Sequence, residues 1–278
     1  MNKKLIATAL LASFAAPLSA FAADAPATPE HAFTGNVTLA SEYLYRGIAQ
    51  TRGKPALQGG FDYAHASGLY AGVWGSNISW INDGTAGASA SLELDVYGGY
   101  KGAITDDFGY DLGVLTYNYP GSGKPTGAAK PDTTEVYGAL SYKWLTVKYS
   151  RSTGSLFGWT KADGTKTKGS GYLELNAAYD LGDGWGINGH VGHQKVKGYS
   201  DASYSDYKVG VTKDVGFGVF GAAYSTTNAK DSCSAVLAAG VPGGTDAANP
   251  YCFSKQSGPL STYDAGKGRL LLTFSKTF

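Results

Sequence analysis

Charged side chains recur at every second residue in several segments of this chain. In the segment 92–101, Glu93, Asp95 and Lys101 share odd positions, and Leu94 and Val96 lie between them. Successive residues of a strand point to opposite faces, so one face would be charged and the other apolar. Rows of charged groups line water-filled pores, where they select ions. Two carboxylates about 7 Å apart along a strand are ordinary in such a row and do not indicate glycoside cleavage.

Residue types that form enzyme centres are scattered. The four histidines are His31, His65, His190 and His193, and the last two lie on one expected strand with opposite facing. A lipid hydrolase on the outer face of a barrel would need a Ser–His pair, such as Ser150 with His190. No G-x-S-x-G turn, phosphate loop, metal triad or dinucleotide fingerprint is present. We therefore expect no enzyme, no metal site and no cofactor.

Strand-like segments of about ten residues recur along most of the chain. Each alternates apolar and polar residues and ends in Gly, Asp, Asn or Pro. The 40 Gly and 20 Tyr, against a single Met, favour strands and turns over helices. We count twelve segments, which begin near Gly35, Ala56, Leu69, Ala90, Phe108, Thr133, Leu145, Gly169, Trp185, Tyr204, Phe217 and Gly268.

The connections alternate between short and long in strict order. Short turns lie around 67, 105–107, 143, 182–184 and 215, and longer loops span 49–55, 80–88, 120–132, 154–168, 197–203 and 228–267. Outer-membrane barrels have short periplasmic turns, longer extracellular loops and an even number of strands. The order therefore predicts an all-β fold, a transmembrane antiparallel barrel of twelve strands. A hairpin hidden in 228–267 would raise the number to fourteen.

Aromatic residues gather near the ends of these segments, as in the girdles at both interfaces of membrane barrels. Tyr is also a good strand former, which is the simpler explanation. Next to short turns stand Tyr100, Tyr110, Tyr142, Trp144, Tyr179, Trp185 and Phe217. Near long loops stand Tyr43, Tyr45, Trp74, Tyr119, Tyr149, Tyr172 and Tyr224.

The two ends of the chain carry signals for export and assembly. Lys3 and Lys4, an apolar run and a small-x-small triplet predict a signal peptide over 1–22, which leaves 256 of 278 residues. We expect a flexible periplasmic segment over 23–32 and the barrel over 33–278. The end, with Phe274 and Phe278, is similar to the signal that barrel-assembly machinery reads, although position 276 is a lysine. A lysine there can extend to the lipid headgroups.

Cys233 and Cys252 are the only cysteines, and both lie in the last long loop. Export would place them where disulfides persist, so we predict a bridge between them. The alternatives are a metal site, which would require a His nearby, and a redox-active pair, which would require the C-x-x-C spacing.

Short motifs through nearly all of the expected mature chain resemble the TorF-type porin family. They are LASEYLYRGIAQT over 39–51, QGG over 58–60, WGSNI over 74–78, ELDVYGGY over 93–100, YNYP over 117–120 and SKTF over 275–278. The resemblance implies an outer-membrane barrel with a channel function and gives no substrate. The loop 228–267 shows no such motif.

Extending the alternation gives a set of charged residues expected to face the lumen. These pore-lining candidates are Glu42, Arg46, Asp62, Glu93, Asp95, Lys101, Asp111, Glu135, Lys148, Glu174 and Lys208. Seven are acidic and four basic, which would favour cations in an open pore. The alternative is a paired, solvated ladder in a narrow barrel.

These patterns predict passive diffusion of ions or small polar solutes through the cell outer membrane of a Gram-negative bacterium. The alternative is a structural or adhesion barrel with a blocked lumen. Arg46, Arg52 and Lys54 would form an anion-attracting vestibule or, alternatively, rim charges that contact lipopolysaccharide phosphates. Expected partners are outer-membrane lipid, lipopolysaccharide and barrel-assembly machinery. The near-neutral charge gives no indication of a nucleic-acid partner.

Overall fold

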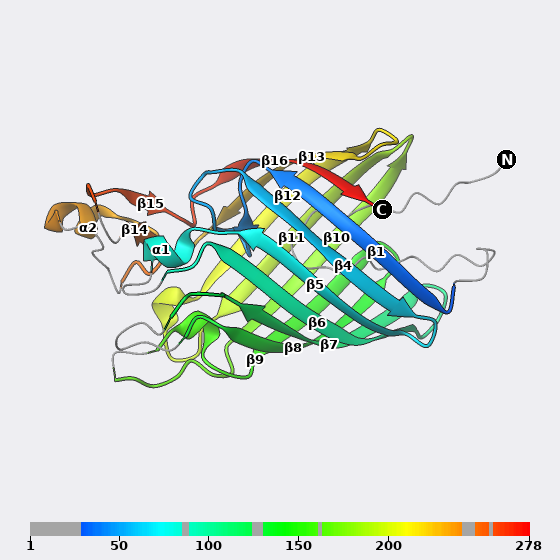
Figure 1. Ribbon diagram of the computed structural model, residues 1–278, viewed down its shortest axis with the longest axis horizontal. Coiled ribbons are helices and arrows are strands. Elements are labelled where there is room, and N and C mark those ends of the chain that lie inside the picture. The colour runs from blue at the N-terminus through cyan, green and yellow to red at the C-terminus, as the bar shows by residue number, and fades with distance from the viewer. Residues whose placement is uncertain (1–28, 85–88, 124–129, 161–162, 241–247, 256–257) are drawn as a thin grey trace.

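Period-two alternation along the chain produces one closed barrel of twelve antiparallel strands (Figure 1). The computed structural model describes residues 29–84, 89–123, 130–160, 163–240, 248–255 and 258–278. The barrel strands are β1 (His31–Ala40), β4 (Ala56–His65), β5 (Leu69–Asn77), β6 (Leu92–Ala103), β7 (Phe108–Asn118), β8 (Thr133–Tyr142), β9 (Leu145–Ser152), β10 (Gly171–Gly182), β11 (Trp185–Lys195), β12 (Tyr204–Asp214), β13 (Val219–Thr227) and β16 (Arg269–Thr277).

Each barrel strand pairs with the next along the chain, and β16 pairs with β1 to close the sheet. The predicted fold class and strand number are confirmed. β1 begins at His31, earlier than expected, because the residues before Gly35 continue the ladder with the end of β4. The predicted signal peptide, 1–22, and most of the segment 23–32 lie outside the described residues.

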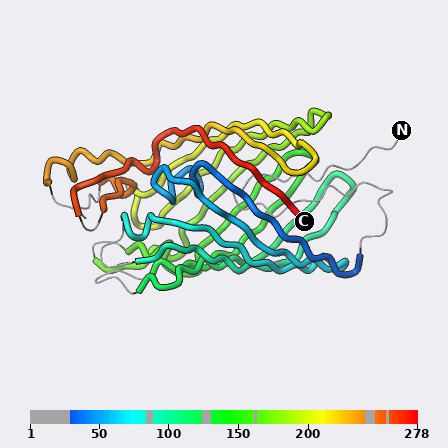
Figure 2. Tube along the Cα trace, turned by 45° about the horizontal axis from the view of Figure 1, so that its top comes forward, coloured from blue at the N-terminus to red at the C-terminus, as the bar shows by residue number. Residues whose placement is uncertain are grey.

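The two ends of the barrel differ in their connections. Short turns join β4 to β5, β6 to β7, β8 to β9, β10 to β11 and β12 to β13 at what we call the turn end, where β1 also begins and β16 finishes. The opposite end, here the loop end, carries the long connections (Figures 1 and 2). These hold β2 (Leu44–Tyr45), β3 (Ile48–Ala49), α1 (Trp80–Gly84), η1 (Leu156–Gly158), η2 (Ser200–Ala202), α2 (Ser234–Ala239), β14 (Cys252–Ser254) and β15 (Thr262–Asp264).

The described elements of the connection 228–268, which are α2, β14 and β15, lie beyond the barrel mouth (Figure 1). β14 and β15 pair only with each other, so the fourteen-strand alternative is wrong. The predicted disulfide between Cys233 and Cys252 is confirmed and joins the residue before α2 to β14, with Val236 packed against it. No helix in the described part of the chain has the length and apolarity needed to cross a membrane.

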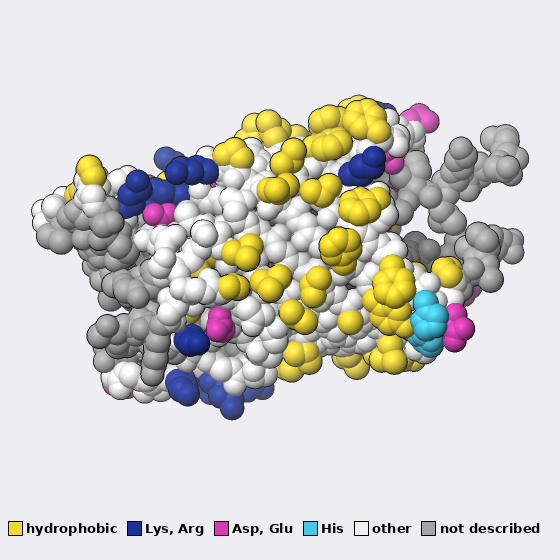
Figure 3. Space-filling model, in the orientation of Figure 1, with side chains coloured by type: hydrophobic (Ala, Val, Ile, Leu, Met, Phe, Trp, Pro, Cys, Tyr) yellow, Lys and Arg dark blue, Asp and Glu magenta, His cyan; other side chains and the backbone are white. Residues whose placement is uncertain are grey.

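The barrel is apolar outside and polar inside. Leu94 and Val96 of β6 are 40% and 46% exposed, whereas Asp95 between them is 0% exposed. The same alternation runs around the sheet, and yellow apolar side chains are spread over the visible wall in Figure 3. Water would disfavour so much exposed apolar surface, and a lipid environment would not.

Tyrosine rings on the inner wall lie against glycines of adjacent strands. A Cβ atom on Gly72 would lie 2.5 Å from the Tyr97 ring, and one on Gly113 would lie 2.4 Å from the Tyr137 hydroxyl oxygen. The rings therefore need a neighbour without a side chain. This arrangement uses part of the high glycine content to hold large aromatic residues inside a narrow barrel.

Candidate functional site

The connection 41–55, here called the first loop, narrows the lumen near the loop end. It contains the hairpin of β2 and β3, whose turn residues Arg46 and Gly47 have φ of 48° and 77°. Two positive φ values are typical of the tightest hairpin turns and favour glycine. A Cβ atom on Gly47 would lie 2.5 Å from the Thr227 Cγ2 atom and 2.9 Å from the Asp206 Cβ atom. The turn therefore packs directly against β12 and β13.

Arg46 reaches the wall opposite the strand from which the first loop starts. Its guanidinium donates to both carboxylate oxygens of Glu135 on β8, at 3.1 and 2.7 Å, and to the Gln194 Oε1 atom on β11, at 2.6 Å. It also lies over the rings of Tyr45 and Tyr172, 4.8 and 4.1 Å from their centroids. In the barrel order β8, β10 and β11 lie across from β1, so the first loop bridges the lumen.

A second contact ties the base of the first loop to β6. The Tyr43 hydroxyl donates to the Glu93 carboxylate at 2.6 Å, and the Tyr43 ring packs edge-on against Trp74. Burial, and then the charge of Glu93, raise the pKa of Tyr43, so its hydroxyl remains a donor. Glu93 itself is 1% exposed. The first loop is thus held by a hydrogen bond on one wall and an ion pair on the other.

Asp95 lies beside this bridge without a hydrogen-bond partner. Its residue is 0% exposed, and within the described residues neither carboxylate oxygen accepts a hydrogen bond. Trp74 on β5 and Tyr117 on β7 are its direct cross-strand neighbours. A buried carboxylate without a donor is costly, so this position favours a cation or a polar group that arrives from outside.

A hydrogen-bonded cluster on β10, β11 and β12 forms the opposite side of the lumen. His190 Nε2 lies 2.8 Å from Asp206 Oδ1, and the Tyr172 hydroxyl donates to Asp206 Oδ2 at 2.9 Å. His190 Nδ1 lies 2.7 Å from the Asn176 Oδ1 atom, and Asn176 donates to Glu174 at 2.8 Å. This cluster pairs its charges internally, in contrast to Asp95.

Nearer the turn end the inward charged groups contact tyrosine side chains. Tyr97 donates to Asp62 at 2.5 Å, and Tyr70 donates to Asp111 at 2.6 Å. The Lys148 ammonium lies 4.1 Å from the centroid of the Tyr137 ring. Asp62 and Lys148 are partly exposed, unlike the buried groups around the first loop.

The sequence model of one bacterial family matches residues 23–249. This chain belongs to the Gcw_chp family, a bacterial family of unknown function. The TorF-type resemblance stays a prediction, because the Gcw_chp description does not carry that name. No curated protein matches the chain.

Solved structures similar to this Gcw_chp protein include two porins and a transporter. The KdgM porin in complex with disordered oligogalacturonate is 8% identical, with a TM-score of 0.48 over 88% of this chain and 98% of that one. The NanC porin is 10% identical, with a TM-score of 0.47 over 88% and 98%. The Pseudomonas putida toluene transporter TodX is 10% identical, with a TM-score of 0.41 over 91% of each chain. Similarities this distant give no solute for this Gcw_chp protein.

The eleven pore-lining candidates all lie on inward-facing strand positions or in the first loop. Glu93, Asp95 and Glu135 lie around the bridge. Glu42 accepts hydrogen bonds at the loop end, from Gly53 N–H and the Tyr263 hydroxyl. Whether these residues contact a permeating solute stays a prediction.

Sequence reasoning missed Asp206, Gln194 and Tyr172 as parts of the lumen network. Asp206 lies two residues before Lys208, so alternation alone could have found it. Gln194 lies four residues after His190 on β11, so alternation places both on the same face. Nothing in the local sequence indicates that Arg46 contacts either Gln194 or Tyr172.

The expected girdle near the long loops is wrong for five of its seven members. Tyr149 and Tyr224 are 49% and 52% exposed on the outer wall. The other five are turned inward, because they lie on lumen-facing positions or in loop segments that pack over the barrel mouth. They are Tyr43, Tyr45, Trp74, Tyr119 and Tyr172.

The structure also places the residues expected at the rim and those considered for an enzyme site. Arg52 lies 3.4 Å from Asp83 and donates to the Ser261 hydroxyl, so it is paired within the loops, while Lys54 is exposed. Ser150 and His190 are buried and inward-facing. Neither residue lies on the lipid-facing surface that the hydrolase alternative requires.

Proposed function

We propose that this protein is an outer-membrane channel for passive diffusion of small cations or small polar solutes, with the first loop as its gate. The observation that carries the proposal is the bridge of Arg46 to Glu135 across a closed barrel that is apolar outside and charged inside. A selective pore needs charged or hydrogen-bonding groups along its lumen, and this barrel has them.

The charges of the lumen favour cations. Seven of the eleven candidates are acidic, and Asp206 adds an eighth inward carboxylate. Among the described residues Asp95 has no hydrogen-bond or ion-pair partner, unlike Glu135, so its position is open to a cation that enters the constriction. Cations that enter the constriction would therefore be stabilised there more than anions.

Passage requires the first loop to move. Glu93, Asp95 and Glu135 are at most 2% exposed, so the described conformation excludes solvent at the constriction. A lumen of twelve strands is also narrower than that of porins with 16 to 18 strands. We therefore expect small conductances and a mixture of open and closed states.

The same filled constriction favours a second candidate, a structural or adhesion barrel with a blocked lumen. That candidate predicts no conductance and a binding function of the loop-end surface. In both cases we propose that the apolar wall contacts outer-membrane lipid, that lipopolysaccharide surrounds the loop end, and that assembly machinery reads Phe274 and Phe278.

The test is single-channel recording of the refolded barrel in a planar bilayer, with the reversal potential taken across a KCl gradient. A first-loop variant, with residues 44–49 replaced by a short Gly–Ser linker, should conduct several-fold more than the natural chain. The matched control is the Cys233→Ser/Cys252→Ser variant, which alters the loop end and leaves the first loop intact. A folded first-loop variant that stays silent would contradict the channel and favour the blocked barrel. A reversal potential of anion-selective sign would contradict the cation preference.

A further inference from the structure

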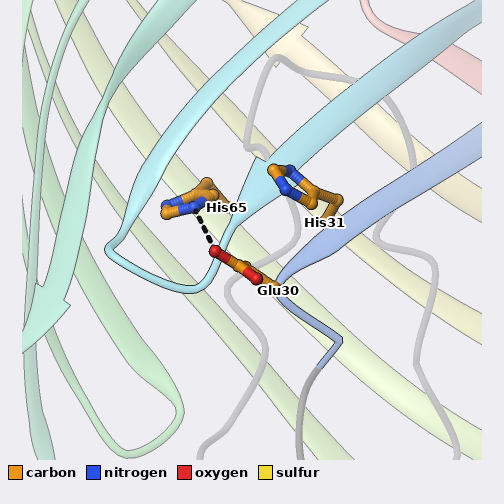
Figure 4. Close-up of side chains that lie close together, drawn as sticks. All are labelled: Glu30, His31 and His65. Carbon is orange, nitrogen blue, oxygen red and sulfur yellow. Dashed lines mark ion pairs between the residues drawn. The ribbon is translucent and has the colours of Figure 1, made fainter.

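One carboxylate and two imidazoles meet on the outer face of the barrel at the turn end (Figure 4). Glu30 precedes β1, His31 is the first residue of β1, and His65 is the last residue of β4. His31 and His65 share the outward parity of Phe33 and Phe61, which are 77% and 65% exposed, and the Glu30 side chain reaches His65 from the residue before β1. The group is therefore outside the lumen and separate from the proposed gate.

The sheet itself holds the three residues together. His31 and His65 are direct cross-strand partners, with ring centroids 5.2 Å apart. The Ala66 N–H donates to the Glu30 carbonyl at 3.0 Å, which continues the ladder one residue beyond β1. The His65 Nε2 atom lies 3.7 Å from the Glu30 Oε1 atom. Backbone pairing thus fixes all three Cα positions without any ligand.

Each imidazole is oriented through its Nδ1 atom. His31 Nδ1 lies 2.9 Å from the Tyr63 hydroxyl, and His65 Nδ1 lies 2.7 Å from the Ser67 hydroxyl and 3.1 Å from the Ser67 backbone nitrogen. Histidines that bind metals characteristically use one ring nitrogen for the ion and the other for such an orienting hydrogen bond. We assign the two nitrogen ligands to the Nε2 atoms. For His65 this requires that Nδ1 carry the proton and donate it to the Ser67 hydroxyl, in place of the hydrogen bond that it accepts from the Ser67 backbone N–H.

We propose that Glu30, His31 and His65 bind a divalent transition-metal ion of the Zn²⁺, Ni²⁺ and Cu²⁺ group. One ligand atom from each residue can be chosen so that all three lie within 4.8 Å of one another. Metal–ligand bonds of about 2.0–2.2 Å would draw these atoms closer by roughly 1 Å. The Glu30 side chain, 76% exposed, is free to make that movement.

The ligand set determines which ions fit. Imidazole suits Zn²⁺, Cu²⁺ and Ni²⁺, whereas Ca²⁺ and Mg²⁺ prefer oxygen ligands. Three protein ligands leave at least one coordination position for water or for a group from another molecule. A bound ion would also fasten the residues before β1 to the turn after β4. Sequence analysis predicted no metal site, because nothing local indicates that β1 and β4 align His31 with His65.

The experiment is calorimetric titration of the folded barrel in detergent, without a histidine tag, with ZnCl₂, NiCl₂ and CaCl₂. We expect one saturable site for Zn²⁺ and Ni²⁺ and none for Ca²⁺. The His31→Ala/His65→Ala variant should lose binding, and Tyr63→Phe should weaken it by about tenfold through loss of the orienting hydroxyl. His193→Ala is the matched control, because His193 is exposed on β11 outside the group, and it should bind as the natural chain does.

Electron paramagnetic resonance of the Cu²⁺ form should show coupling to two imidazole nitrogens, reduced to one in His31→Gln. His31→Gln changes an exposed side chain at the start of β1 and serves where the double variant fails to fold. Zn²⁺ affinity that is unchanged in a folded His31→Gln or double variant would overturn the site. Equal binding of Ca²⁺, or no saturable Zn²⁺ binding up to millimolar concentration, would overturn it as well.

Discussion

The loop-end and turn-end halves of the lumen are built by the same strands, but the first loop fills only the loop-end half. Towards the loop end, Glu93, Tyr117 and Glu135 are at most 2% exposed, because the first loop fills the space between the walls. Towards the turn end, Asp62 and Lys101 keep partial exposure. Inward charge is common to both halves. This difference in exposure indicates that the constriction is formed by the first loop, which crosses the barrel, and not by the alternation of the strands.

The largest expected effect comes from Arg46→Ala in the loop-end half. It removes the cation that pairs with Glu135 and leaves a buried carboxylate, at a cost of about 3 to 5 kcal/mol. We expect a higher open probability in bilayers and a lower urea midpoint for the folded barrel. Lys101→Ala, in the turn-end half, is the control and should change both quantities little. Equal effects of the two variants would remove the distinction between the halves.

Asp95→Asn should have the opposite effect on stability. It replaces a buried carboxyl group that has no donor among the described residues with a neutral amide, which should stabilise the folded barrel by about 2 kcal/mol. Cation preference should fall at the same time, measured as a reversal potential closer to zero. Asp62→Asn is the comparison, because Asp62 accepts a hydrogen bond from Tyr97. A larger change of selectivity in Asp62→Asn would place the selective step in the turn-end half.

A smaller loss should follow from Gly113→Ala on the inner wall. The added methyl group would meet the Tyr137 hydroxyl and the Gly98 carbonyl oxygen at 2.4 and 2.9 Å, and such overpacking costs about 1 to 3 kcal/mol. Gly189→Ala has open space at its Cβ position and should be close to neutral. Urea unfolding of the two variants in the same detergent measures the difference. Equal midpoints would mean that the Tyr137 ring is not fixed against the wall.

The smallest effect on the barrel should come from the Cys233→Ser/Cys252→Ser pair. The disulfide lies in the loop 228–268, beyond the barrel mouth, so conductance and the urea midpoint should not change. Limited proteolysis should instead cut this loop faster, because the bridge restricts its unfolded forms. A changed conductance would show that this loop also gates the lumen.

The strand pattern was predictable because it is local. Alternation around Leu94, Asp95 and Val96 indicates which residues face inward without any knowledge of their partners. The disulfide also followed from two cysteines in one loop. Even Asp206 was within reach, two residues from Lys208.

The bridge was not predictable, since its residues are far apart in the chain. Arg46 meets Glu135 and Gln194 only because β8 and β11 lie across the barrel from β1. Nothing near Arg46 distinguishes a side chain inserted into the lumen from one at the rim. The inward position of Tyr43 was not predictable for the same reason, because it depends on a contact with Glu93, which is distant in the chain.

The contact between β1 and β16 has a consequence for how the barrel assembles. It aligns five residue pairs, against ten between β1 and β4 on the other side. It is also the contact of greatest chain separation in the wall, since it joins the first strand to the last. Loop-closure entropy makes such a contact the slowest to form, whereas the neighbouring hairpins need only local closure. The twelve strands should therefore gather as an open curved sheet whose edges join last, and the same junction is where the finished wall would part first under lateral force.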